Sequence, residues 1–193
     1  MPMKTLFSIL LLFCIQLISA QEANHKTVLE APESWRPEII EMPLSFAPSL
    51  DYKGFEDIRF APGWADTTAS DYFTYTFTWV LDKNPKLNQK KLETQTKAYF
   101  DGLMAAVSER NDLPKTEASF EFSKVKTAFA ALGDVSFYEA FFSKKVITLK
   151  VLATGEKCKA TGKYLVRFNL SPSTDKATWE KMDEVKLKVD CGK

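Results

Sequence analysis

The sequence predicts an α+β fold: an antiparallel sheet with one long helix packed on a face and a short C-terminal helix. Three patterns support it. Aromatic residues alternate with threonines over residues 72–81, as in a half-buried strand. Apolar residues recur at helical spacing over residues 88–109. Later apolar runs are separated by hairpin-length connections, which suit antiparallel rather than parallel strands.

The remaining elements follow in order along the chain. Residues 35–64 combine prolines with apolar side chains, so we expect an extended segment lying across the domain rather than a helix. After the long helix we expect strands over residues 118–125, 135–142, 146–153 and 164–170, with a turn at Gly133-Asp134. A short helix over residues 175–184 and a strand over residues 186–191 complete the domain.

Residues 1–20 are typical of a secretory signal peptide. Lys4 provides a positive start, an apolar run follows, and small residues precede Gln21. We therefore expect a signal peptide at residues 1–20, a mobile leader at 21–34 and a single globular domain at 35–193. The expected location is secreted or periplasmic, with no transmembrane segment in the mature chain.

Three cysteines are present, of which Cys14 lies in the predicted signal peptide. The remaining pair, Cys158 and Cys191, is expected to form a disulfide, because two cysteines in an oxidising compartment most simply pair with each other. Such a bond would close a loop of about 30 residues and stabilise the fold by about 3 kcal/mol.

Several function classes are disfavoured by composition. The chain has 26 Lys and Arg against 25 Asp and Glu, and Lys4 lies in the leader, so the mature chain is formally neutral and nucleic acid is not an expected partner. Its single histidine, His25, lies in the predicted leader, which argues against a histidine-dependent nucleophile. No catalytic residues, cofactor or metal site are therefore predicted.

One surface has the residue types of a binding site. Four acids surround Trp64 and Tyr72 in the sequence, namely Glu56, Asp57, Asp66 and Asp71. Aromatic platforms with acids suggest carbohydrate binding, or glycoside hydrolysis by two carboxylates. The alternative is that they are solvated loop acids around a packing anchor. Glu121 and Glu139 are expected to face solvent, and Arg59 and Arg167 to reach the surface or pair with an interior carboxylate.

Several segments resemble a group of exported bacterial single-domain proteins of uncharacterised function. They are residues 35–38, 59–64 and 72–79, together with Ser171-Pro172, Trp179 and Cys191. The resemblance implies export and one domain, and it implies no activity.

The predicted function is that of a secreted or periplasmic non-catalytic binding domain. Its partner would be a protein, an envelope polymer or a small ligand. One alternative is a carboxylate-dependent hydrolase acting on envelope or extracellular glycan. Another is an assembly protein that pairs through an exposed sheet edge.

Overall fold

The structure is a computed structural model that describes residues 27–126 and 128–191. The predicted signal peptide, His25 and the first part of the predicted leader lie outside the described residues. Within the described part of the chain, neither helix combines the length and apolar character needed to cross a membrane.

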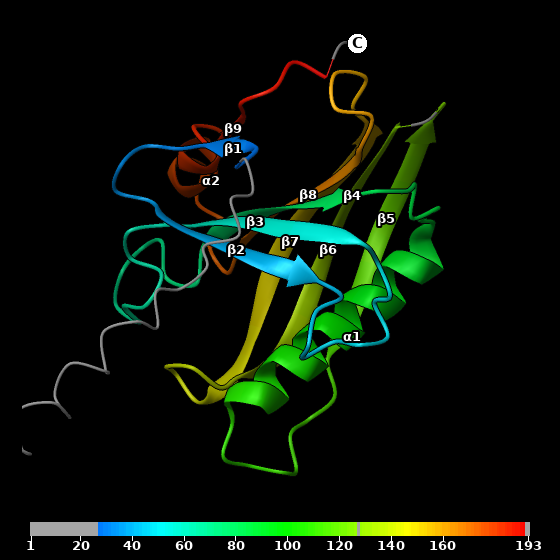
Figure 1. The fold of residues 1–193 in the computed structure, drawn as a ribbon. Coiled ribbons are helices and arrows are strands. Elements are labelled where there is room, and N and C mark those ends of the chain that lie inside the picture. The colour runs from blue at the N-terminus through cyan, green and yellow to red at the C-terminus, as the bar shows by residue number, and fades with distance from the viewer. Residues whose placement is uncertain (1–26, 127, 192–193) are drawn as a thin grey trace, which may run out of the picture.

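A seven-stranded antiparallel sheet forms the centre of the domain (Figure 1). The strand order is β2-β3-β4-β8-β7-β6-β5, and the predicted α+β class is confirmed. The bounds are β2 (Arg36–Met42), β3 (Gly54–Phe60), β4 (Tyr75–Leu81), β5 (Glu117–Val125), β6 (Ala128–Glu139), β7 (Lys145–Lys157) and β8 (Tyr164–Ser171).

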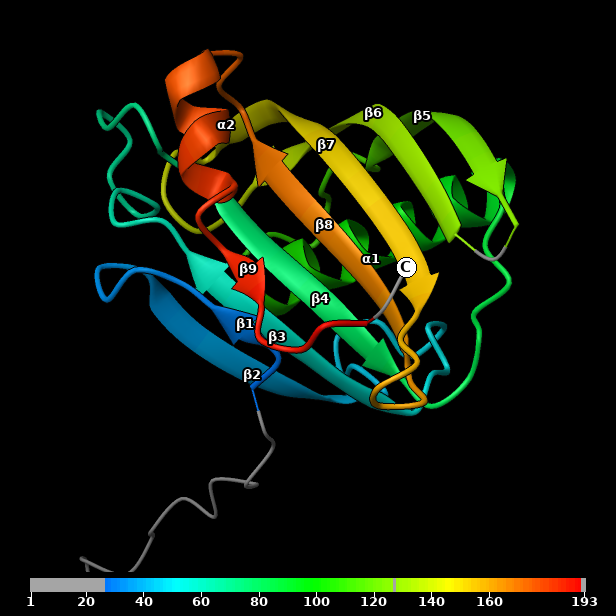
Figure 2. The same ribbon diagram turned by 90° about the horizontal axis from the view of Figure 1, so that it is seen from above.

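The long helix α1 (Gln89–Val107) covers what we call the inner face of the sheet, which curves around it (Figure 2). Asn88 caps the helix, and its side chain accepts a hydrogen bond from the backbone N–H of Lys91 at 2.9 Å. Leu92, Tyr99 and Phe100 are buried against the aromatic side chains of the sheet. The predicted helix and its apolar stripe are thus confirmed, and together with the sheet they form the main core.

The opposite, outer face is also partly covered (Figure 2). The cover consists of α2 (Lys176–Met182) and a small antiparallel sheet of β1 (Leu29–Glu30) and β9 (Lys186–Leu187). Leu29 is fully buried, so the prediction of a mobile leader is wrong for the part of residues 21–34 that the structure describes. The predicted strand over residues 186–191 is shortened to two residues.

This second layer changes the environment of β4. The alternation over residues 72–81 predicts a strand buried on one face, yet Thr74, just before β4, and Thr76 and Thr78 within it are all buried, because the outer face above them is covered. A strand buried on both faces is therefore flanked by two cores, the main core and a smaller one that includes Trp35, Val80 and Met182.

The predicted turn at Gly133-Asp134 is wrong, because both residues lie within the continuous strand β6. Gly133 serves close packing instead. A Cβ there would lie 2.2 Å from the Ser119 carbonyl oxygen and 2.5 Å from the Phe120 ring on neighbouring β5. Only glycine allows this approach without a shift of the backbone.

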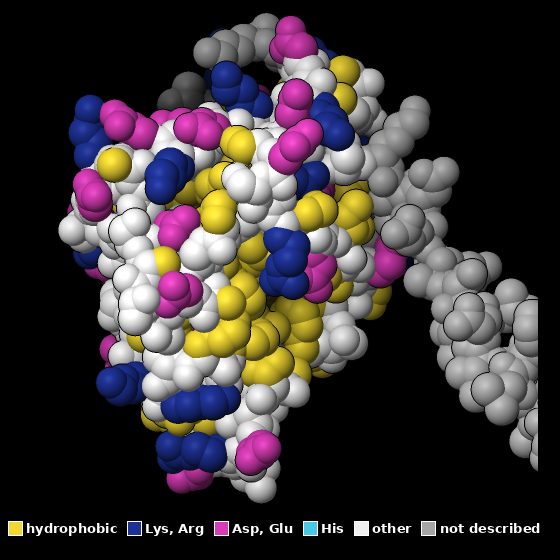
Figure 3. Space-filling view, turned by 90° about the vertical axis from the view of Figure 1, so that its left-hand side faces the viewer, with side chains coloured by type: hydrophobic (Ala, Val, Ile, Leu, Met, Phe, Trp, Pro, Cys, Tyr) yellow, Lys and Arg dark blue, Asp and Glu magenta, His cyan; other side chains and the backbone are white. Residues whose placement is uncertain are grey.

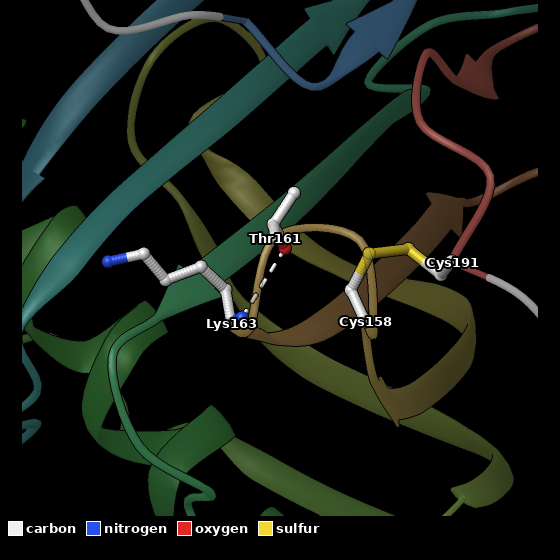
Figure 4. The surroundings of a disulfide bond; sticks show 4 residues. All are labelled: Cys158, Thr161, Lys163 and Cys191. Atoms are coloured by element: carbon white, nitrogen blue, oxygen red, sulfur yellow. Dashed lines mark hydrogen bonds between the residues drawn. A yellow bond between two sulfur atoms is a disulfide. The ribbon is translucent and has the colours of Figure 1, made fainter.

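The predicted disulfide between Cys158 and Cys191 is confirmed (Figure 4). It joins the turn after β7 to the chain that follows β9. In the same turn, the hydroxyl of Thr161 accepts a hydrogen bond from the Lys163 N–H at 3.3 Å. The disulfide thus attaches the end of the outer layer to the sheet that this layer covers.

Candidate functional site

The four predicted acids do not form one surface. Glu56 and Asp57 are adjacent on β3, so their side chains point to opposite faces of the sheet. Both are fully buried, so neither the predicted ligand surface nor the alternative of solvated loop acids holds for them. No pair of facing carboxylates arises from these two residues.

Glu56 is buried among aromatic side chains on the inner face. Its Oε2 accepts a hydrogen bond from Trp79 Nε1 at 2.6 Å, and its Oε1 accepts one from the Tyr99 hydroxyl at 2.9 Å. Burial raises the pKa of Glu56 to about 7, and the negative charge of Glu38 adds to the rise. The two hydrogen bonds only partly oppose that shift, so Glu56 changes its charge close to neutral pH.

Asp57 anchors the N-terminal segment on the outer face. Its Oδ2 accepts hydrogen bonds from the Thr27 hydroxyl at 2.7 Å and from the backbone N–H groups of Val28 and Leu29 at 2.8 and 3.0 Å. Arg59 forms an ion pair with Oδ1 and donates to the Leu29 carbonyl at 2.7 Å. Arg59 is thus paired in the interior, and both residues have structural roles.

Asp66 and Asp71 shape the loop over residues 61–74. Asp66 is exposed, and its Oδ1 accepts hydrogen bonds from the hydroxyl and N–H of Thr68 at 2.7 and 2.9 Å, which lower its pKa. Asp71 is buried, and its Oδ2 accepts from the Gly63 N–H at 3.4 Å. These contacts fold the loop that carries Trp64 and Tyr72.

Of the predicted site residues, Trp64 and Tyr72 lie in one aromatic cluster, because the rings of both contact Phe73 and Phe142. Five rings form what we call the aromatic hollow: Phe60, Trp64, Phe73, Phe141 and Phe142. The centroids of the other four rings lie 4.5 to 5.7 Å from that of Trp64. Figure 3 shows the side of the molecule where β3 ends and β4 begins, and hydrophobic side chains gather there in a hollow between charged groups.

Two polar groups in this region lack a partner among the described residues. They are the indole Nε1 of Trp64 and the hydroxyl of Tyr75, both buried. Most buried polar groups in proteins are hydrogen-bonded, so each unpaired one calls for an explanation. Above the rings, the guanidinium of Arg36 lies 4.5 Å from the Phe60 centroid and 5.3 Å from that of Trp64, within the range of a cation–π interaction.

Glu139 holds the turn that carries Phe141 and Phe142. Its carboxylate accepts hydrogen bonds from the Tyr72 hydroxyl at 2.6 Å and from the backbone N–H groups of Phe142 and Ser143 at 2.9 and 2.5 Å. Although burial opposes the change, these bonds leave its pKa below the usual value. The expectation that Glu139 faces solvent is therefore wrong. Its partner Tyr72 lies 67 residues earlier in the chain, and nothing in the sequence near Glu139 indicates this contact.

Among the described residues, no three His, Cys, Asp or Glu side chains gather in a way that could hold a metal ion. Comparison with protein-family models, with curated proteins and with solved structures finds no match to this chain. The resemblance to exported bacterial proteins therefore stays a prediction.

Proposed function

We propose that this chain is an exported, non-catalytic binding domain whose ligand occupies the aromatic hollow. The observation that carries the proposal is the unpaired, buried Nε1 of Trp64 among aromatic rings, of which those of Phe141 and Phe142 are half-buried. A hydrogen-bond acceptor on a ligand would satisfy that donor, and the rings would bury an apolar body. Ligand sites commonly combine apolar walls with a few polar groups in this way.

Export is supported by two independent features. The N-terminal residues have the charge and apolar pattern of a signal peptide. The Cys158–Cys191 disulfide is of a kind that persists in oxidising compartments and is rare in the cytosol. Together they favour a periplasmic or secreted location.

The arrangement of the rings favours a small ligand over a glycan. Sugars bind to an open aromatic face, but the indole of Trp64 already packs against Phe60, Phe73, Phe141 and Phe142. The expected ligand is therefore a compact, largely apolar molecule with one hydrogen-bond acceptor.

Binding of N-phenyl-1-naphthylamine, an uncharged apolar fluorophore, to the mature chain tests the proposal. Phe142→Ser removes a half-buried ring from the hollow, and Leu132→Ser removes a side chain that is 59% exposed on the outer face. Because burying a side chain of this size is worth about 2 kcal/mol, we expect about thirtyfold weaker binding in the first variant. Equal affinity in the two variants, or no saturable fluorescence, would contradict the proposal.

A carboxylate-dependent hydrolase is the second candidate, favoured by the raised pKa of Glu56, about 7. Against it, both oxygens of Glu56 are hydrogen-bonded and the side chain is fully buried. Mature protein and Glu56→Gln should be assayed on a panel of glycans and esters. Turnover that the substitution abolishes, in a variant that remains folded, would replace the binding proposal with this one.

A further inference from the structure

A groove runs along the outer face of the sheet, away from the aromatic hollow. It comprises two adjoining cavities of about 330 and 350 Å³, which share Thr154, Arg167 and Leu187. The segment from α2 to β9 lies over this part of the sheet (Figure 2). Apolar side chains form much of the remaining lining, among them Leu152, Val185 and Leu165.

Three polar side chains lie in a row across the floor of this groove. Arg167 on β8 is directly opposite Thr78 on β4 and directly opposite Thr154 on β7. Directly paired residues of antiparallel strands point to the same face, with Cβ atoms about 5 Å apart. The stem of the Arg167 side chain therefore lies between the side chains of Thr78 and Thr154. Asp57, which is ion-paired with Arg59, follows in the same row, directly opposite Thr78 on β3.

Arg167 is held in place by neutral groups. Its Nε donates to Asn169 Oδ1 at 3.1 Å, and its Nη2 donates to the carbonyls of Met182 and Val185 at 3.2 and 2.6 Å. No described carboxylate forms an ion pair with it. Arg59, the other arginine of this face, has Asp57 as a partner.

The groove contains further charges at its edges. Asp183 and Lys186 line one cavity, and Glu156 lines the other. Asp183 and Lys186 are exposed, so solvent screens them more than it screens Arg167. Among the described residues, the hydrogen bonds of the half-buried Arg167 side chain use Nε and Nη2 and leave Nη1 free to meet a ligand.

Thr78 provides a second, independent observation. Its hydroxyl is buried and has no partner among the described residues. Two neighbouring threonines on the same side of the sheet, one just before β4 and one within it, are hydrogen-bonded. Thr74 shares a hydrogen bond of 2.7 Å with Ser171, and Thr76 donates to Asn169 at 3.0 Å. Only the threonine beside Arg167 among these three is left unpaired.

We propose that this groove binds the carboxylate of a small ligand with an apolar body. The carboxylate would accept hydrogen bonds from Arg167 and from the hydroxyls of Thr78 and Thr154, and its apolar part would lie along Leu165 and Leu187. Arginine is well suited to carboxylates because its N–H groups match their geometry. A phosphate dianion fits less well, since Asp183 and Glu156 would repel its second charge.

The test is an NMR titration of the ¹⁵N-labelled mature chain with benzoate, and with benzamide, its neutral counterpart of the same shape. Inorganic phosphate is a third arm. We expect saturable shifts with benzoate at the amides of Thr78, Thr154 and Arg167, and much smaller ones with benzamide and phosphate. Equal binding of benzamide, preferred binding of phosphate, or benzoate shifts confined to the aromatic hollow would overturn the proposal.

Two matched variants separate binding from folding. Thr78→Val removes the unpaired hydroxyl of the groove. Thr96→Val removes an equally buried, unpaired hydroxyl on α1, at the inner face. A hydrogen bond to a charged group is worth enough that its loss weakens binding about tenfold. We therefore expect Thr78→Val to weaken benzoate binding about tenfold and Thr96→Val to leave it unchanged.

Arg167→Gln should abolish benzoate binding. Because this variant also loses hydrogen bonds to Met182 and Val185 at the end of α2 and just after it, its fold should be checked by circular dichroism. If it unfolds, the threonine pair decides the outcome. Unchanged benzoate affinity in Thr78→Val would overturn the proposal whatever Arg167→Gln does. The aromatic hollow is not part of this groove. The benzoate titration can therefore contradict this proposal without affecting the fluorophore test of the proposed function, and the reverse also holds.

Discussion

The two faces of the sheet bury an acid in contrasting ways, although Glu56 and Asp57 are adjacent on the same strand. Glu56 on the inner face is surrounded by aromatic rings and has two neutral donors. Asp57 on the outer face has an arginine, a hydroxyl and two backbone N–H groups. Equal burial therefore does not imply an equal role: the first acid is sensitive to pH, whereas the second is a structural anchor.

The largest expected effect comes from the outer face. Asp57→Ala leaves Arg59 buried without its ion-pair partner and releases the β1 segment, so we expect a loss of about 3–5 kcal/mol of unfolding free energy. Chemical denaturation of the mature chain measures it. A loss below about 1 kcal/mol would mean that Asp57 and Arg59 are not a buried pair in solution.

Removing the disulfide tests how far the outer layer depends on its attachment. Cys158→Ser with Cys191→Ser should lower the unfolding free energy by about 2–5 kcal/mol. Hydrogen exchange should lose protection at β1 and β9 while α1 stays protected, because the disulfide holds only the outer layer. Uniform loss of protection across both faces would contradict this division.

Glu56 predicts a pH dependence on the inner face. Its pKa is raised from 4.5 to about 7, so the folded state binds more protons than the unfolded state between these values. Stability should therefore fall by about 3 kcal/mol as pH rises through this window. Glu139, whose pKa is lowered, acts in the opposite sense and only in more acidic solution.

Denaturation midpoints of the wild type and Glu56→Gln at several pH values measure this effect. The variant lacks a titratable group at position 56, so its stability should be flat across the same window. If wild type and variant show the same pH profile, another group is responsible for the dependence.

The smallest expected effect compares two threonines on the outer side of the sheet, Thr74 just before β4 and Thr78 within it. Thr74→Val removes a hydroxyl that is bonded to Ser171 and should lower the unfolding free energy by about 1 kcal/mol. Thr78→Val removes an unpaired hydroxyl and should leave stability unchanged or slightly higher. A larger loss for Thr78 than for Thr74 would show that the Thr78 hydroxyl has a partner in the folded protein.

Much of the fold could be predicted from local patterns. The apolar stripe of α1 and the aromatic alternation of β4 both depend on near neighbours in the chain. The strands β2 and β3 were foreseen only as an extended segment, since prolines and adjacent acids such as Glu56-Asp57 obscure their alternation. A glycine beside an aspartate usually marks a turn, which is why the sequence predicts one at Gly133. In the structure Gly133 lies within a strand, where its missing side chain leaves room for the Phe120 ring.

The candidate site was less predictable. Trp64 and Tyr72 could be identified because acids and aromatic residues surround them in the sequence. The residues that complete the cluster, Phe141, Phe142 and Glu139, come from a hairpin end far along the chain. The outer groove was not anticipated at all. Its row of Thr78, Thr154 and Arg167 exists only because β4, β8 and β7 are neighbours in the sheet.

Local side-chain chemistry, read along the chain, was sufficient for the α+β class, the long helix and the cysteine pair, because periodicity, capping and residue type act over a few positions. Only the tertiary structure determines three further features: the charge environment of Glu56 and Asp57, the cover over the outer face, and the assembly of both candidate sites. Strand order and long-range packing decide which distant residues meet, and burial among those neighbours sets what each polar group can do.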